Sequence, residues 1–290
     1  ASHGLPADFA FEVIAPSIPG YGFSAQPKKR GFSQAAAARI FWKLMLRVGH
    51  DKFYLQGGDW GSVIVSNLAK LYPENVHGVH LNMLMSVGMS GGNFKALAYS
   101  VLGTFFPKLL FADENHHNFN FFSNIRLFLV EMGYLHIQST KPDTVGTALN
   151  DSPIGLAAYI LEKFSTWTNP DFIDLPDGGL TKKFTMDELL IIVMIYWTQG
   201  NIVSSQRFYR EFFTDPDNHK LENTYLSVPT GHAAFKYELS DEPPEISSIM
   251  YNLTSRASFS DGGHFAAFEH PEWLSRHLFS FVGGLLDKKF

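Results

Sequence analysis

Cysteine is absent from this sequence of 290 residues. Its absence excludes disulfide bonds, thiolate metal sites and a cysteine nucleophile, and it removes the usual indicator of redox compartment. No apolar run approaches the roughly 20 residues that a helix needs to cross a bilayer, and the N-terminus shows no signal-peptide pattern. There is also no basic run, and the formal net charge is −5, so nucleic acid is not expected as a partner.

Apolar and aromatic residues are plentiful. The chain is 45% hydrophobic and 18% charged, which is ordinary for a globular protein and sufficient for one large core or two smaller ones. Aromatic residues make up 15%, with Phe the most frequent, and this composition fits either an apolar pocket or a large aromatic core. The twelve histidines do not predict a metal site, because His116 and His117 are adjacent and cannot share a helix face, and no HExxH pairing occurs.

Strands and helices alternate in the first and last parts of the chain, which predicts a mostly parallel α/β sheet with helices on both faces. Each predicted strand is a short apolar run bounded by Gly, Pro or polar residues. The predicted strands are Phe11–Pro16, Phe53–Leu55, Val76–Met83, Thr224–Gly231 and Ser255–Phe259. The predicted helices of these parts are Gln34–Val48, Ser62–Leu71 and Pro271–Phe281.

The middle of the chain has a different pattern. From Asn93 to about Leu221 the apolar residues follow helical spacing, without clear alternating strands. We therefore expect an α/β core in two parts, residues 1–85 and 222–290, with a helical cap, residues 86–221, inserted between them. Helices are predicted within this insertion over Phe121–Met132, Ile154–Trp167, Met186–Thr198 and Ile202–Phe212.

The turn after the strand Phe53–Leu55 is the most informative motif of the sequence. It reads Gly57-Gly58-Asp59-Trp60-Gly61 and leads directly into a predicted helix. A strand, a tight turn of small residues and a helix are typical of the nucleophile elbow of α/β-hydrolases. Serine is the usual nucleophile at such a turn, so the presence of Asp59 changes the chemistry that the site can perform.

A histidine and an acid follow in the order that α/β-hydrolases use. His264 comes after a predicted strand and a pair of glycines, which suits a general base. Parallel strands place the residues at their carboxyl ends on one rim of the sheet, so His264 and Asp59 are expected to lie together. The acid is left open by its position alone, because three acids follow the strand Thr224–Gly231, namely Glu238, Asp241 and Glu242.

An aspartate nucleophile restricts the reaction. A carboxylate attacks an electrophilic carbon and forms an alkyl ester, which suits an epoxide or an alkyl halide; a peptide or an ester would give an unfavourable anhydride. Water activated by His264 would hydrolyse the alkyl ester, with the backbone N–H of Trp60 holding the oxyanion. Epoxide opening also needs a proton donor, and a tyrosine with a pKa of about 10 can supply one. The insertion offers Tyr99, Tyr134, Tyr159, Tyr196 and Tyr209.

These motifs resemble those of the microsomal epoxide hydrolases, which include the juvenile hormone epoxide hydrolases of insects. The resemblance covers nearly the whole chain. It rests on the elbow Gly57–Gly61, the loop Pro16–Ser24 and the segment Gly263–Glu269. It continues through Gly133–Gln138, Lys141–Gly146, Leu156–Ser165, Ser204–Tyr209 and Val228–Gly231.

The resemblance implies an α/β-hydrolase fold and an enzyme of the cis-stilbene oxide hydrolase class, which detoxifies apolar epoxides, whether xenobiotic, lipid or terpenoid, by converting them to vicinal diols without a cofactor or metal. It assigns Asp59 as nucleophile, His264 as general base and Glu238 as charge-relay acid. It assigns Tyr134 and Tyr209 as proton donors to the epoxide oxygen. Members of the family are held on the endoplasmic reticulum membrane by an N-terminal segment with no counterpart here, so this chain alone is expected to be soluble.

The spacing of one family motif predicts a gap in the sheet. His3-Gly4-Leu5-Pro6 has the letters of the His-Gly-X-Pro loop, which completes the oxyanion site in the family, but its distance from the next strand does not fit that loop. In that fold a helix separates the loop from the next strand, but only Ala7 to Ala10 precede Phe11 here, too few for a helix and crossover. We therefore expect a fragment that lacks the strand between Phe11–Ala15 and Phe53–Leu55, with reduced stability and impaired activity. A melting temperature above about 60 °C with full turnover would contradict this.

The sequence leaves two other functions open. A different hydrolase with an aspartate nucleophile, such as a haloalkane dehalogenase, would need halide-binding donors in place of the tyrosine pair. A catalytically weak fragment or binding module would keep only the apolar pocket. Assays of an aryl epoxide and a haloalkane distinguish these possibilities.

Overall fold

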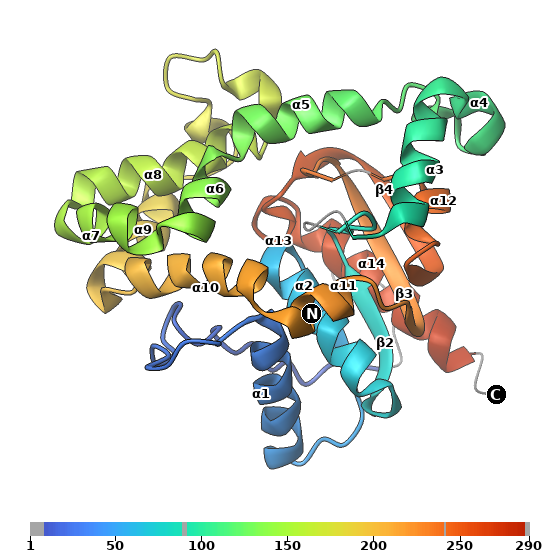
Figure 1. The fold of residues 1–290 in the computed structure, drawn as a ribbon, viewed down its shortest axis with the longest axis horizontal. Coiled ribbons are helices and arrows are strands. Elements are labelled where there is room, and N and C mark those ends of the chain that lie inside the picture. Colours follow the sequence, from blue (N-terminus) through green and yellow to red (C-terminus); the bar gives the residue numbers. More distant parts are fainter. Residues whose placement is uncertain (1–8, 89–91, 241, 288–290) are drawn as a thin grey trace.

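The computed structural model describes residues 9–88, 92–240 and 242–287, and these form a parallel sheet covered by helices (Figure 1). Four strands lie in the order β1-β2-β3-β4, and every neighbouring pair is parallel. This arrangement confirms the predicted α/β class. The strands are β1 (Phe53–Gly57), β2 (Val76–Leu81), β3 (Leu226–Tyr237) and β4 (Tyr251–Gly263).

Strand β2 shows why helices cover both faces of the sheet. Val79 and Leu81 belong to the core cluster that also contains the apolar face of α2 (Asp59–Leu71). The alternate residues Gly78 and His80 face α14 (Pro271–Asp287) on the other side, because successive side chains of a strand point to opposite faces. Helix α1 (Gln34–Arg47) packs outside α2.

Between β2 and β3 the described residues form helices and connecting loops, as predicted. In Figure 1, α5 to α9 form a separate layer at the upper left, and α10 lies between this layer and α1 and α2. The sequence pattern predicted α5, α8, α9 and α10, and the structure adds five other α-helices. The helices are α3 (Phe94–Phe105), α4 (Pro107–Leu110), α5 (Phe121–Glu131), α6 (Gly133–Thr140), α7 (Pro142–Asp151), α8 (Pro153–Thr166), α9 (Met186–Gln199), α10 (Ile202–Thr214) and α11 (Pro216–Glu222).

Strands β3 and β4 extend at least four residues beyond their predicted carboxyl ends. Strand β3 continues to Tyr237, so Glu238 follows its carboxyl end directly. Strand β4 continues to Gly263, so His264 follows it in the same way. Two short helices, α12 (Pro244–Ser247) and α13 (Ala266–Glu269), flank β4. None of the described helices has the length and apolar character that a membrane-spanning segment requires.

The prediction of a strand over Phe11–Pro16 is wrong. These residues have no regular secondary structure, and β1 pairs only with β2 within the described part of the chain. A cavity of about 680 Å³ lies between the segment Phe11–Ile18 and β1. A strand requires a hydrogen-bonded neighbour, and this cavity separates Phe11–Ile18 from β1, so the two do not pair. His3-Gly4-Leu5-Pro6 lies outside the described residues.

Candidate active site

Asp59 occupies a strained turn between β1 and α2. Its φ angle is +46°, and among the described residues it is the only non-glycine with a positive φ, a conformation that costs energy for residues with a side chain. Gly58 leaves room for this turn, because a Cβ there would lie 2.6 Å from the side chain of Asn82. The Ser62 hydroxyl donates to the Asp59 carbonyl at 2.7 Å. The turn therefore presents the Asp59 carboxylate, whose side chain is 47% exposed, at the end of the sheet.

His264 lies between two carboxylates. Its Nε2 is 3.3 Å from Oδ1 of Asp59, and its Nδ1 is 2.7 Å from Oε1 of Glu238. The side chains of His264 and Glu238 are almost fully buried, at 5% and 1% exposure. The carboxyl ends of β1, β3 and β4 thus bring Asp59, Glu238 and His264 together. Of the other two candidate acids, Glu242 instead accepts from the Ser86 amide at 2.9 Å, and Asp241 lies outside the described residues.

The two carboxylates favour the imidazolium form of His264. Burial alone would lower the pKa of His264, but the charge of Glu238 and the hydrogen bonds and charge of both carboxylates raise it to about 10. Burial likewise opposes ionisation of Asp59, yet His264 and the Trp60 amide, which donates to the carboxylate, hold the Asp59 pKa below its usual value. Both shifts favour an ion pair between Asp59 and His264 in the resting site.

The backbone around His264 is held from two sides. Glu269 of α13 accepts from the amides of Gly263 and Phe265 at 3.0 and 3.1 Å. The His264 amide itself donates to the Trp167 carbonyl at 2.9 Å, and a Cβ on Gly263 would lie only 2.2 Å from that carbonyl oxygen. Glycine at position 263 is thus required for the close approach to the Trp167 carbonyl. Burial raises the pKa of Glu269 to about 7, although its hydrogen bonds with both amides lower it.

Tyr134 of α6 and Tyr209 of α10 form a pair that lines the same cavity as Asp59. Their rings meet edge to face with centroids 5.8 Å apart, and their hydroxyls share a hydrogen bond. The Tyr209 ring also packs against Trp60 at 4.8 Å. Burial is the main cause of the raised pKa of each tyrosine, and the charge of Asp59 adds to it. Both hydroxyls consequently stay protonated and available as donors at neutral pH.

The other tyrosines of the insertion have different surroundings. Tyr99 donates to the Leu110 carbonyl at 3.2 Å and belongs to a separate core cluster. Tyr159 lines the cavity, but it donates to Gln138 at 3.0 Å. Tyr196 also lines the cavity, and burial raises its pKa to about 12. Sequence reasoning missed Tyr21, whose hydroxyl donates to the Ser205 carbonyl beside the site at 2.7 Å.

These groups face a cavity of about 690 Å³ between the sheet and the helical insertion. Its walls are largely apolar and aromatic, and Trp167 packs edge to face on His264 at 4.9 Å. Lys163, which the sequence did not single out, places its ammonium 5.1 Å from the Tyr134 ring centroid. Within the described ranges, no cluster of potential metal ligands occurs. Further lining residues are Gln56, Gln138, Ile160, Phe164, Ile192, Ile202, Phe265, Ala266, Ala267 and Phe268.

Comparison with protein families identifies one match over most of the chain. Residues 3–271 match the family model described as alpha/beta hydrolase fold. Among curated proteins, epoxide hydrolase 1 of Sus scrofa is 51% identical over an alignment of 292 positions, which covers 99% of this chain and 63% of that protein. The juvenile hormone epoxide hydrolase of Bombyx mori is 42% identical over 279 residues, 95% of this chain and 59% of that protein. The chain thus spans about three fifths of these relatives' length.

Solved structures give the same picture. The crystal structure of juvenile hormone epoxide hydrolase from the silkworm Bombyx mori superposes with a TM-score of 0.89 at 41% identity, covering 95% of this chain and 64% of that one. The structure of Aspergillus niger epoxide hydrolase superposes with a TM-score of 0.69 at 28% identity, covering 93% and 62%. These superpositions show that the chain shares the fold of two solved epoxide hydrolases.

Proposed function

Because the chain belongs to the alpha/beta hydrolase fold family, we propose that it hydrolyses epoxides to vicinal diols through an alkyl ester on Asp59. One observation carries the proposal: His264 bridges Asp59 and Glu238 in a cavity that also holds the tyrosine pair. The names of the similar proteins, epoxide hydrolase 1 and juvenile hormone epoxide hydrolase, support the same reaction.

In the first step the Asp59 carboxylate attacks one carbon of the epoxide. The bond between that carbon and the ring oxygen breaks, and Tyr134 or Tyr209 donates a proton to the oxygen, which becomes the first alcohol. The shared hydrogen bond of the two hydroxyls lets one tyrosine stabilise the oxygen while the other donates. The product of this step is a neutral ester between the Asp59 carboxyl and the substrate carbon.

Ester formation prepares His264 for the second step. The charge and the hydrogen bond of Asp59 help to hold the His264 pKa high, and both weaken once Asp59 is esterified. The imidazolium then passes its proton, through solvent, to the tyrosinate that the first step left behind. The neutral imidazole, oriented by Glu238, can act as a base. Neutral His264 accepts a proton from water, and the oxygen attacks the ester carbonyl carbon. The Trp60 amide stabilises the oxyanion. The ester bond breaks as the His264 imidazolium returns its proton to the leaving oxygen, and the diol leaves. The Asp59 carboxylic acid then gives its proton to His264, which restores the carboxylate.

The cavity favours apolar substrates. Its aromatic walls and its volume of about 690 Å³ suit a bulky epoxide, either xenobiotic or of lipid or terpenoid origin. We further propose that residues 86–221 act as a cap over the catalytic rim formed by residues 1–85 and 222–290. Attachment to the endoplasmic reticulum is proposed only for a longer protein of this family.

Single turnover in heavy-oxygen water tests the ester. Excess enzyme is mixed with an aryl epoxide, and Asp59 and the diol are analysed by mass spectrometry. We expect the label first in the Asp59 carboxyl, because water attacks that carbon; label that appears first in the diol contradicts the ester. Asp59→Asn should show no turnover. A haloalkane tested in parallel should not react, and preferential release of halide would favour a dehalogenase.

A further inference from the structure

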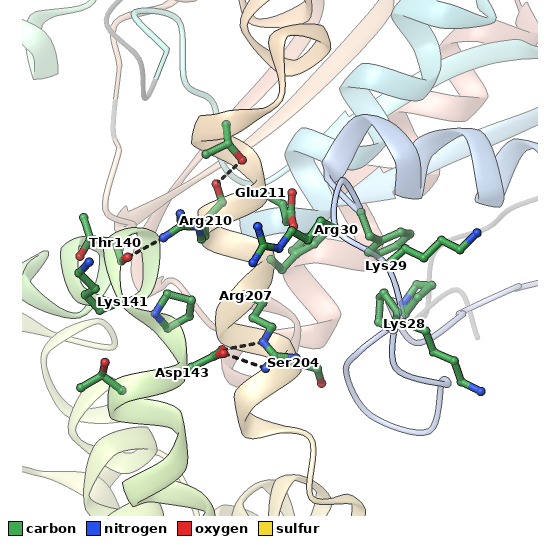
Figure 2. A pocket seen from close by; sticks show the side chains of 17 residues that line it. Lys28, Lys29, Arg30, Thr140, Lys141, Asp143, Ser204, Arg207, Arg210 and Glu211 are labelled. Atoms are coloured by element: carbon green, nitrogen blue, oxygen red, sulfur yellow. Dashed lines mark hydrogen bonds and ion pairs between the residues drawn. The ribbon is translucent and has the colours of Figure 1, made fainter.

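A second cavity, which the proposed reaction does not use, lies on the outer side of α10. It has a volume of about 720 Å³ and is bordered by the loop of residues 27–32, the junction of α6 with α7, and α10 (Figure 2). On α10 it is lined by Arg207, Arg210 and Glu211. At 3.6 residues per turn, Arg207 and Glu211 lie roughly 160° around the helix from Tyr209. One helix therefore separates this cavity, the outer groove, from the catalytic cavity.

The outer groove is strongly positive. It contains six cationic side chains and two carboxylates, Asp143 and Glu211, so its formal net charge is +4, whereas the whole chain carries −5. A local charge opposite to that of the chain attracts anions and focuses them into a concave site. The cationic residues are Lys28, Lys29, Arg30, Lys141, Arg207 and Arg210.

The arginines converge on one end of the groove. Arg207 binds the Asp143 carboxylate with two donors, at 2.6 and 2.9 Å, and Arg30 and Arg210 also act electrostatically on that carboxylate. Arg210 uses one further donor on the Thr140 carbonyl, at 2.7 Å. A guanidinium has five N–H donors, so Arg207 and Arg210 retain donors for a ligand. In Figure 2, Arg30 points toward α10, while Lys28 and Lys29 extend away from Asp143.

The start of α7 adds to this positive end. Lys141 and Pro142 begin the helix there, and no side chain caps its N-terminus. The N-terminal turn carries partial positive charge, which favours an anion close to it. Asp143 lies in this first turn and is one of the two carboxylates already counted in the groove. Without Lys28 and Lys29, which extend away from Asp143, the remaining four cations and two carboxylates still leave a formal net charge of +2 at this end.

We propose that the outer groove binds the phosphate group of a phosphate ester. A phosphate monoester carries up to two negative charges, and its oxygens match the forked donors of arginine. The excess of positive charge fits a dianion better than a single carboxylate. The phosphate group could belong to a small soluble ester or to a lipid headgroup, since both present the same oxygens.

Calorimetric titration with inorganic phosphate at low ionic strength tests the site, with chloride at equal ionic strength as the reference. The double variant R30A/R210A removes two guanidinium groups. The matched control K43A/R47A removes the same charge from exposed positions on α1. We expect phosphate affinity to fall at least about tenfold in the groove variant and to stay within about twofold of the native value in the control. Equal loss in both, or no binding beyond that of chloride, overturns the proposal.

A second variant and a second ligand complete the test. R30E changes only an exposed loop residue, so it keeps the test valid if R30A/R210A does not fold, and it should weaken phosphate binding at least as strongly as one arginine deletion. Glycerol phosphate in solution and vesicles containing phosphatidic acid are then compared. Arg30-dependent binding of glycerol phosphate assigns a soluble ester, and Arg30-dependent binding of vesicles alone assigns a lipid headgroup. If glycerol phosphate and the vesicles both bind and R30E weakens neither, the proposed site is wrong.

Discussion

Glu269 accepts hydrogen bonds from the backbone on both sides of His264: one carboxylate oxygen accepts from the Gly263 amide and the other from the Phe265 amide. The histidine side chain points into the cavity while its flanking peptides are fixed from behind. A base that must accept a proton from a positioned water benefits from such rigidity. Glu269 itself contacts neither Asp59 nor Glu238 by any hydrogen bond found among the described residues, so we treat it as a positioning residue.

Glu269→Gln should lower kcat about tenfold with little change in KM, because an amide side chain can accept from only one of the two backbone N–H groups. The Glu269 pKa is about 7, and the ionised form accepts from both amides. Native activity should therefore rise with pH through about 7, and this limb should be missing in the variant. Glu74→Gln, an exposed carboxyl on another element, is the control. An unchanged pH profile in Glu269→Gln would contradict the positioning role.

Removal of either tyrosine hydroxyl should impair epoxide opening. Since Tyr134 and Tyr209 share the task, Tyr134→Phe and Tyr209→Phe should each lower the rate of ester formation about tenfold, and the double variant at least a hundredfold. Stopped-flow measurement of ester formation isolates this step. Tyr99→Phe, which alters a hydroxyl outside the cavity, should retain native rates. A double variant with a native rate would show that another group donates the proton.

Asp59→Asn should lower the pKa of His264, in addition to abolishing turnover. The Asp59 carboxylate helps to raise that pKa to about 10, and the amide removes its charge while preserving its shape. Nuclear magnetic resonance titration of the imidazole ring measures the change directly. The same variant imitates the neutral ester, so a His264 pKa equal to that of the native protein would argue against the proposed release of the base.

Stability should fall in alkaline solution because of His264. Its pKa is raised in the folded state, so the stabilisation is fully present below about 6.5, the unfolded value, and is lost as the pH rises through about 10. In Glu238→Gln the largest electrostatic cause of the raised pKa is removed, so the loss should begin at a lower pH. Thermal melts of both proteins between pH 6 and about 10.5 measure the shift. Parallel curves would contradict this assignment.

Strand β1 should be the least protected strand of the sheet. Within the described ranges its outer edge pairs with no strand and borders the cavity of about 680 Å³ beside the segment Phe11–Ile18, whereas β2 is paired on both sides. Amides of β1 that point away from β2 should therefore exchange with deuterium at least about a hundredfold faster than those of β2. The same edge leads us to expect a melting temperature below about 60 °C. Equal protection of the two strands would show that the edge is covered.

Local features of the fold could be predicted from the sequence. The short apolar run, the glycine pair and the following helical spacing identify the turn at Asp59, because each depends only on neighbouring residues. The helices α5, α8, α9 and α10 are long and periodic, and they were predicted to within a few residues. The parallel sheet follows from the alternation of strands and helices.

Features that depend on distant partners could not be predicted. Phe11–Pro16 has the composition of a strand, but a ladder needs a neighbour that composition does not reveal. The extension of β3 to Tyr237 passes through Gly231 and two alanines, which weaken the strand pattern, and only this extension places Glu238 next to His264. The residues themselves also gave no means to choose among five tyrosines, because pairing across α6 and α10 is a tertiary property.

The backbone contact between Trp167 and Gly263 restricts how a substrate can reach the site. The two backbone segments are in direct contact there. The His264 amide donates a hydrogen bond to the Trp167 carbonyl, and no side chain that could move lies between them. If the end of α8 were lifted as a lid, it would pull His264 away from Asp59 and Glu238. We therefore expect the entrance to open elsewhere, by movement of side chains or of other helices, while the end of α8 stays in place.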